Sequence, residues 1–174
     1  MRLAPVALRW FNHRTRAVEA ARTQSRTTHA TAAAVEACAL LAEILVDTIL
    51  TGNRECTLRS GRASGLSVSA IAQGSWQGKA RDEISSTPYV VHTLEAALWA
   101  VDRTDDFRSA VLLAANLGGD AGTVAAVAGQ IAGALWGKSA IPKAWLERLA
   151  WRETIEERGR QLLAAADVEE NHGG

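Results

Sequence analysis

The chain has 174 residues, of which 48% are hydrophobic and 22% charged, so it is large and apolar enough for one globular domain, and disorder is excluded. Nineteen basic residues balance nineteen acidic ones, and this zero net charge argues for neither a nucleic-acid partner nor a membrane surface. The most apolar window, residues 111–136, is interrupted by Asn116 and Asp120, so it falls short of the about 20 uninterrupted apolar residues of a membrane span.

The first 29 residues are basic, with six arginines against the single acid Glu19, whereas the segment from Trp145 onward is rich in acids. The six are Arg2, Arg9, Arg14, Arg16, Arg22 and Arg26. A start rich in arginine also imitates a mitochondrial transit peptide, but Pro5 and the domain-like run around it favour a folded segment.

An apolar stripe predicts the first long helix, which begins after Thr31, a suitable N-cap, and stops at Gly52. Cys38 lies in this stripe and is expected to be a buried, inert thiol. It has no metal-type or disulfide-type spacing to the second cysteine, Cys56, so we expect a soluble protein of the reducing cytoplasm.

Loops and shorter helices follow. The polar segment 52–65 is predicted to be a loop, and Val68, Ile71, Ala72 and Trp76 indicate a second, shorter helix. Pro88 disfavours a helical Thr87, so the next helix is expected to start after it and to carry the apolar stripe 91–101.

Three more helices are predicted in the second half of the chain. Asp105 and Asp106 can cap a helix through Phe107, and a helix of small residues ends near Gly137. Pro142 suits the first turn of another helix, with Trp145, Leu146 and Leu149 facing inward, and Ile155, Leu162 and Leu163 indicate a last one. No segment alternates like a strand, so the predicted fold is all-α.

Glycines recur on the small-residue helix. Gly129, Gly133 and Gly137 are spaced by four residues, which places them on one side of the helix. Each interior glycine costs about 0.5–1 kcal/mol relative to alanine. We expect the compensation to be a close approach of another helix or of a ligand to the backbone, and plain core packing is compatible with a metal-binding turn at the start of this helix.

The run Gly118-Gly119-Asp120-Ala121-Gly122-Thr123 stands at the start of that helix. An Asp, a second Asp two residues later and a Thr at a helix start would direct hard oxygen ligands to one point, as Mg²⁺ or Mn²⁺ requires. Asp120 and Thr123 are present, but Gly122 occupies the position of the second Asp. A water would have to replace a charged oxygen there, so we expect weak metal binding.

Three segments resemble the ADP-ribosylglycohydrolase family, which includes the dinitrogenase reductase-activating glycohydrolases. The run 116–134 is similar to the C-terminal signature of the family, Ser25-Arg26-Thr27-Thr28-His29 resembles its Ser-x-x-Thr-His segment, and 89–99 resembles a further family helix. The chain is therefore identified as a member, with a partial family domain over residues 1–166 and a polar tail over 167–174.

The resemblance implies an all-α hydrolase that uses two Mg²⁺ or Mn²⁺ ions to remove ADP-ribose from a protein side chain or a related acceptor. It makes Asp120 and Thr123 metal ligands and implies a further ligand group, a Thr/Ser-Asp-Asp motif, that has no counterpart here. Thr104-Asp105-Asp106 has these letters, but its position before the Phe107 helix favours a helix cap. We expect a chain truncated at its N-terminus, from a truncated gene, a start assigned too far downstream or a degenerate paralogue.

The resemblance also implies three substrate-binding residues, His29, Tyr89 and Arg2, and leaves the catalytic residue unknown. His29 is equally compatible with a hydrogen-bonding surface residue. Tyr89 could stack on an adenine ring or pack at a helix start, and the Ser-Gly-Tyr of the family is altered here to Thr87-Pro88-Tyr89. Arg2 would contact a diphosphate if the family's preceding loop were present.

These observations leave three functions open. The first is an enzyme of the ADP-ribosylglycohydrolase type, whose activity we expect to be weak or absent in this chain. The second is a non-catalytic remnant that binds ADP-ribose or an ADP-ribosylated protein. The third is a helical module that binds an anionic polymer through the basic N-terminal segment. An uncovered surface of the small-residue helix would favour association.

Overall fold

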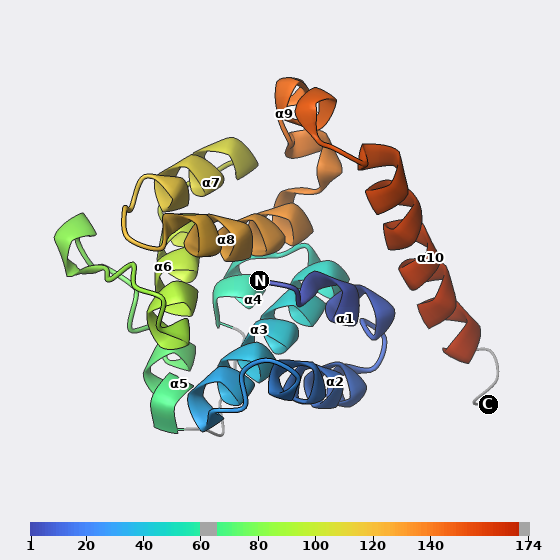
Figure 1. Ribbon diagram of the computed structural model, residues 1–174, viewed down its shortest axis with the longest axis horizontal. Helices are drawn as coiled ribbons and strands as arrows, with labels where there is room; N and C mark the ends of the chain where they lie inside the picture. Colours follow the sequence, from blue (N-terminus) through green and yellow to red (C-terminus); the bar gives the residue numbers. More distant parts are fainter. Residues whose placement is uncertain (60–65, 171–174) are drawn as a thin grey trace.

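The structure, a computed structural model, describes residues 1–59 and 66–170, and within these ranges it contains helices and turns but no strand (Figure 1). The all-α prediction is confirmed. The helices are α1 (Ala4–Arg9), α2 (Arg14–Arg26), α3 (Ala32–Thr51), α4 (Arg54–Arg59), α5 (Leu66–Ala72), α6 (Val90–Asp102), α7 (Phe107–Ala115), α8 (Ala121–Trp136), α9 (Lys143–Arg148) and α10 (Arg152–Glu170), with short 3-10 turns at η1 (Arg81–Glu83) and η2 (Lys138–Ala140).

The central element of the core is α3, which packs against α1, α2, α4, α5, α6 and α8. Its two boundaries lie where the sequence predicts them. The Thr31 hydroxyl accepts a hydrogen bond from the Ala34 amide at 3.3 Å, and Gly52 ends the helix with φ +57°. Burial of Leu40 and Ile44, each 2% exposed, anchors the helix by the hydrophobic effect.

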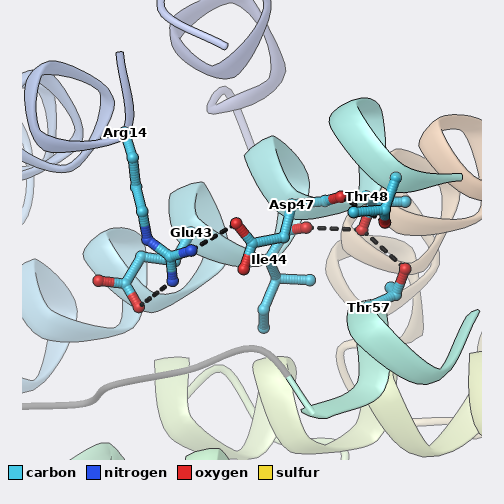
Figure 2. Close-up of polar contacts among 7 residues, drawn as sticks. Arg14, Glu43, Ile44, Asp47, Thr48 and Thr57 are labelled. Carbon is cyan, nitrogen blue, oxygen red and sulfur yellow. Dashed lines mark hydrogen bonds and ion pairs between the residues drawn. The ribbon is translucent and has the colours of Figure 1, made fainter. Parts of the chain in front are cut away.

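Polar contacts join two neighbouring helices to α3, as Figure 2 shows. Arg14 of α2 donates to Glu43, at 3.3 Å, and to Asp47 on the surface of α3. In the interior, Thr48 Oγ1 lies 3.0 Å from Thr57 Oγ1 of α4, and both side chains are fully buried. The Thr57 hydroxyl donates to the Asn53 carbonyl and accepts from Thr48, whose single proton is shared between Thr57 and the Ile44 carbonyl, so neither hydroxyl is an unsatisfied buried polar group.

The segment predicted to be a loop after Gly52 is partly helical, which corrects the prediction. Asn53 caps α4, because its Oδ1 accepts from the amides of Glu55 and Cys56 at 2.8 and 3.2 Å. Residues 60–65 of the predicted loop lie outside the described residues. The helix predicted after them is α5, which ends at Ala72, and the buried Trp76 lies in the turn beyond it.

The starts of α6 and α7 also follow the prediction. α6 begins after Pro88. Asp106 caps α7 by accepting from the Ser109 amide at 2.8 Å and the Ser109 hydroxyl at 2.6 Å, and these bonds lower the pKa of its carboxyl group. Asp105 forms an ion pair with Arg54 at 2.7 Å. The Thr104-Asp105-Asp106 sequence is therefore a helix cap, as expected.

The glycines of α8 do not have the close contacts that their spacing led us to expect. A Cβ at Gly129 would lie 3.7 Å from Val111, and one at Gly133 would lie 3.8 Å from Phe107, which are ordinary van der Waals distances. This face of α8 does pack on α7, so core packing is the correct interpretation for these two. Gly137 ends the helix with φ +75°.

The C-terminal helices differ from the prediction in what they bury. Trp145 of α9 packs edge-on against Phe107, with 6.3 Å between ring centroids, but Leu149 is 46% exposed and does not face inward. α10 lies at the edge of the molecule in Figure 1, where it contacts α1, and it continues beyond residue 166. Its Ile155 is 51% exposed. No helix of the described chain is both long and apolar enough to cross a membrane.

Candidate functional site

The start of α8 brings the two predicted metal ligands together. Gly118 and Gly119 have φ values of +78° and +59°, and this left-handed turn leads into Asp120, the N-cap of α8. Thr123 Oγ1 donates to Asp120 Oδ1 at 2.8 Å, and Asp120 is half-buried. The Asp120 carboxylate makes no capping hydrogen bond to the helix backbone, so the turn leaves it available to a ligand.

The residues at this turn form only part of a metal site. Mg²⁺ takes about six oxygen ligands, with carboxylates as the strongest. Asp120 supplies one carboxylate and Thr123 one hydroxyl, and Gly122 supplies no side-chain oxygen. Within the described ranges, no three His, Cys, Asp or Glu side chains are grouped so that they could hold a metal ion. This part of the chain therefore does not fit a two-metal centre by itself.

Ser86 holds this turn from the side. Its backbone oxygen accepts the Asp120 amide at 3.0 Å, and its hydroxyl donates to the Gly118 carbonyl at 2.8 Å. The approach is so close that a Cβ at Gly119 would lie 2.0 Å from the Ser86 oxygen. Ser86 was not predicted from the sequence, and the signal that could have indicated a close contact is the pair of adjacent glycines.

Tyr89 lies three residues beyond Ser86, at the start of α6. Its side chain is 48% exposed, and its ring meets the His92 imidazole edge-on with 5.1 Å between centroids. His92 Nδ1 is in turn 2.8 Å from Thr87 Oγ1. A half-exposed aromatic ring of this kind can accept a flat ring by stacking. His92 was not predicted, although its position one helical turn after Tyr89 is readable in the sequence.

Arg2 and His29 lie together in a second group. Arg2 Nη2 donates to Thr28 Oγ1 at 3.2 Å, and His29 Nδ1 lies 3.0 Å from the same oxygen. Gln24 donates to the Arg2 carbonyl at 3.1 Å. All three of the exposed side chains, Arg2, Thr28 and His29, therefore point to one place at the end of α2.

Gln130 of α8 connects this second group to the helix that carries the first. Its amide accepts from Ala4 N–H at 2.8 Å and donates to the Met1 carbonyl at 2.8 Å. Gln130 follows Thr123 by seven residues, which is two turns, or about 10 Å, along the same side of the helix. The predicted residues thus form two groups that α8 holds apart, and neither Gln24 nor Gln130 was predicted.

The basic N-terminal segment is largely engaged within the fold. Arg14 pairs with the acids of α3 described above, and Arg22 pairs with Glu36 of α3 at 3.1 Å, an interaction that raises the pKa of Arg22. The guanidinium carbons of Arg9 and Arg16 lie 4.1 and 5.3 Å from the ring centroid of Trp10. The acids of α3 therefore neutralise Arg14 and Arg22, and the anionic-polymer hypothesis stays a prediction that depends on the other four arginines.

Comparison with known proteins gives one consistent family. The family model described as ADP-ribosylglycohydrolase matches residues 1–172. Two proteins named ADP-ribosylarginine hydrolase Tri1, from Pseudomonas putida (strain GB-1) and Serratia proteamaculans (strain 568), are 45% and 46% identical over 83% and 84% of this chain. An ADP-ribosyl-[dinitrogen reductase] glycohydrolase of Rhodospirillum rubrum is 38% identical over 48% of the chain and 29% of its own length.

A solved structure titled ADP-ribosylglycohydrolase-related protein complex has the same fold, with a TM-score of 0.84 and 36% identity over 95% of this chain. The chain covers only part of each of these proteins. It spans 39% and 40% of the two arginine hydrolases and 58% of the solved chain.

Proposed function

Because the chain belongs to the ADP-ribosylglycohydrolase family, we propose that it recognises the ADP-ribosyl group of proteins modified on arginine. The observation that carries this proposal is the 45–46% identity to the two ADP-ribosylarginine hydrolases across more than four-fifths of the chain. The corresponding reaction is hydrolysis of the bond between ribose and the arginine side chain. We expect this activity to be weak or absent in the chain as given, because its metal ligands are incomplete.

The side chains of the two groups suit different parts of an ADP-ribosyl group. Tyr89 offers an exposed ring for the adenine, and Arg2 offers a guanidinium for the diphosphate. His29, beside Arg2, offers a ring nitrogen for a hydroxyl or phosphate oxygen. Asp120 and Thr123 are the residues of this chain that would hold Mg²⁺ or Mn²⁺, and a complete site would need further ligands.

Calorimetric titration with ADP-ribose tests the recognition. We expect measurable heat at micromolar to millimolar ligand and at least about a fivefold loss of affinity for Tyr89→Ala, since stacking on an aromatic side chain is worth about 1–3 kcal/mol. Trp151→Ala is the matched control, because Trp151 is an exposed aromatic residue, 83% accessible, next to α10. Absence of heat at millimolar ADP-ribose would remove the proposal.

Release of ADP-ribose from an ADP-ribosylated arginine peptide, with Mn²⁺ present, separates the enzyme from a non-catalytic binding protein. Binding of ADP-ribose without its release from the peptide supports a non-catalytic binding protein. Gly122, which supplies no metal ligand, favours this outcome. Electron paramagnetic resonance of Mn²⁺ then tests the ligands. Asp120→Asn should abolish any binding, whereas Asp105→Asn, at a 98% exposed side chain of the α7 cap, should leave it unchanged.

A further inference from the structure

We propose that Ser86 is a positioning residue, which joins the loop carrying Tyr89 to the turn carrying Asp120 and thereby fixes their relative position. The proposal rests on the proposed function for its consequence, since Tyr89 and Asp120 are the two groups that a bound ligand would contact. The contacts on which it depends involve no ligand and can be tested without one.

Ser86 makes two hydrogen bonds to the turn, one in each direction. It accepts the Asp120 amide through its carbonyl, at 3.0 Å, and donates its hydroxyl to the Gly118 carbonyl, at 2.8 Å. Two hydrogen bonds at Ser86 fix both the distance between the loop and the turn and their relative orientation. One hydrogen bond would leave the orientation free. Only the hydroxyl bond depends on residue type, so a substitution can remove it and leave the backbone bond in place.

Gly119 is the complementary part of this contact. With a Cβ it would approach the Ser86 oxygen to 2.0 Å, so no other residue type fits while both hydrogen bonds are present. A second anchor lies at the other end of the loop, where the Arg81 guanidinium donates to the carbonyls of Asn116, at 3.3 Å, and Leu117. The loop is therefore attached on both sides of the glycine pair.

Tyr89 is held to the same loop by short-range contacts. Its amide donates to Thr87 Oγ1 at 3.3 Å, and its carbonyl accepts the Thr93 amide at 3.0 Å as the first bond of α6. The path from Asp120 to Tyr89 thus passes through Ser86 and three residues of backbone. Since α6 and α8 also pack directly on one another, loss of the Ser86 hydroxyl should loosen this path without unfolding the protein.

The chain offers a direct spectroscopic test, because Tyr89 is its single tyrosine. Protein labelled with 3-fluorotyrosine should give one ¹⁹F resonance. We expect Asp120→Asn to displace this resonance, and we expect the displacement to fall to less than half when Ser86→Ala is also present. Ser85→Ala, a change at the neighbouring exposed serine, should leave the displacement intact, and Ser86→Thr, which retains a hydroxyl, should restore it.

Hydrogen exchange of the Asp120 amide provides a second measurement. Its rate should rise about fivefold in Ser86→Ala, as expected when one ordinary hydrogen bond near it is lost, and should not rise in Ser85→Ala. The proposal is overturned if Ser86→Ala leaves both the exchange rate and the ¹⁹F displacement at their wild-type values, or if Asp120→Asn produces no displacement in the wild-type background. Neither measurement uses ADP-ribose or metal, so a failure of the proposed function would be seen separately, in the calorimetry.

Discussion

Alanine at Gly119 should destabilise the protein far more than alanine at the adjacent Gly118. Both glycines have positive φ, at +59° and +78°, so each alanine would incur the left-handed backbone cost of about 1–2 kcal/mol. The two positions differ in the space around them. A Cβ at Gly118 would have no atom within 4 Å, whereas a Cβ at Gly119 would meet the backbone oxygen of Ser86 at 2.0 Å.

The size of the stability loss follows from the contacts that a Cβ at Gly119 would break. A Cβ essentially never lies closer than 3.0 Å to a heavy atom of this kind, so Ser86 and the turn have to move apart. This movement breaks the Asp120 amide bond and the Ser86 hydroxyl bond, each worth about 1 kcal/mol. We therefore expect Gly119→Ala to lower the free energy of unfolding by about 3–4 kcal/mol and Gly118→Ala by about 1–2 kcal/mol.

Urea denaturation followed by far-ultraviolet circular dichroism measures both values. The difference between the two variants isolates the contact with Ser86, because the conformational cost is common to both. A difference smaller than about 0.5 kcal/mol, within the usual error of such extrapolations, would refute the reasoning. Ser86→Ala should not rescue Gly119→Ala, since the atom in the way belongs to the backbone.

Three other changes test separate parts of the structure. Gly122→Asp should strengthen Mn²⁺ binding by about tenfold or more, because it adds a carboxylate, and an unchanged affinity by paramagnetic resonance would remove this turn from the metal proposal. Hydrogen bonds from Arg152 and Lys138 lower the pKa of Glu156 from 4.5 to about 2. Its stabilising contribution is therefore complete above pH 4.5 and is lost as the pH falls through about 2, and a carboxyl titration by NMR with its midpoint near 4.5 would contradict these contacts. Thr57→Val should lower the free energy of unfolding by about 1–2 kcal/mol, because it removes a buried hydrogen-bond partner of Thr48, and denaturation equal to wild type would contradict that role.

The helix boundaries could be predicted from the sequence where a side chain caps its own helix. Thr31, Gly52 and Asp106 act within one turn of their own positions, so their chemistry is visible in a short window of sequence. α4 could not be predicted in this way, because it has no apolar stripe. It is held by Asn53 at its start and by Thr57 against α3, and the second of these is a contact between two helices.

In the candidate site, too, contacts between residues close in sequence could be predicted, and contacts between distant residues could not. Asp120 and Thr123 were predicted as a pair because they are three residues apart on one helix. The contact of Ser86 with Gly118 joins residues 32 apart, and that of Gln130 with Met1 joins residues 129 apart, so only the folded chain brings them together. Periodicity likewise identified the apolar positions of α10, but it does not say whether another element covers them.

The turn at Gly118 to Thr123 can identify the family without specifying the activity, because its residues serve two separate purposes. Gly119 is required by the backbone of Ser86, whatever the turn binds. Gly122, by contrast, is exposed, and a Cβ there would have no atom within 4 Å, so the fold would accept an aspartate at this position. The architecture of the turn therefore persists independently of the ligand that position 122 could supply. A likeness carried by the glycine pair is evidence for the fold, and catalytic activity has to be tested at Asp120, Gly122 and the metal itself.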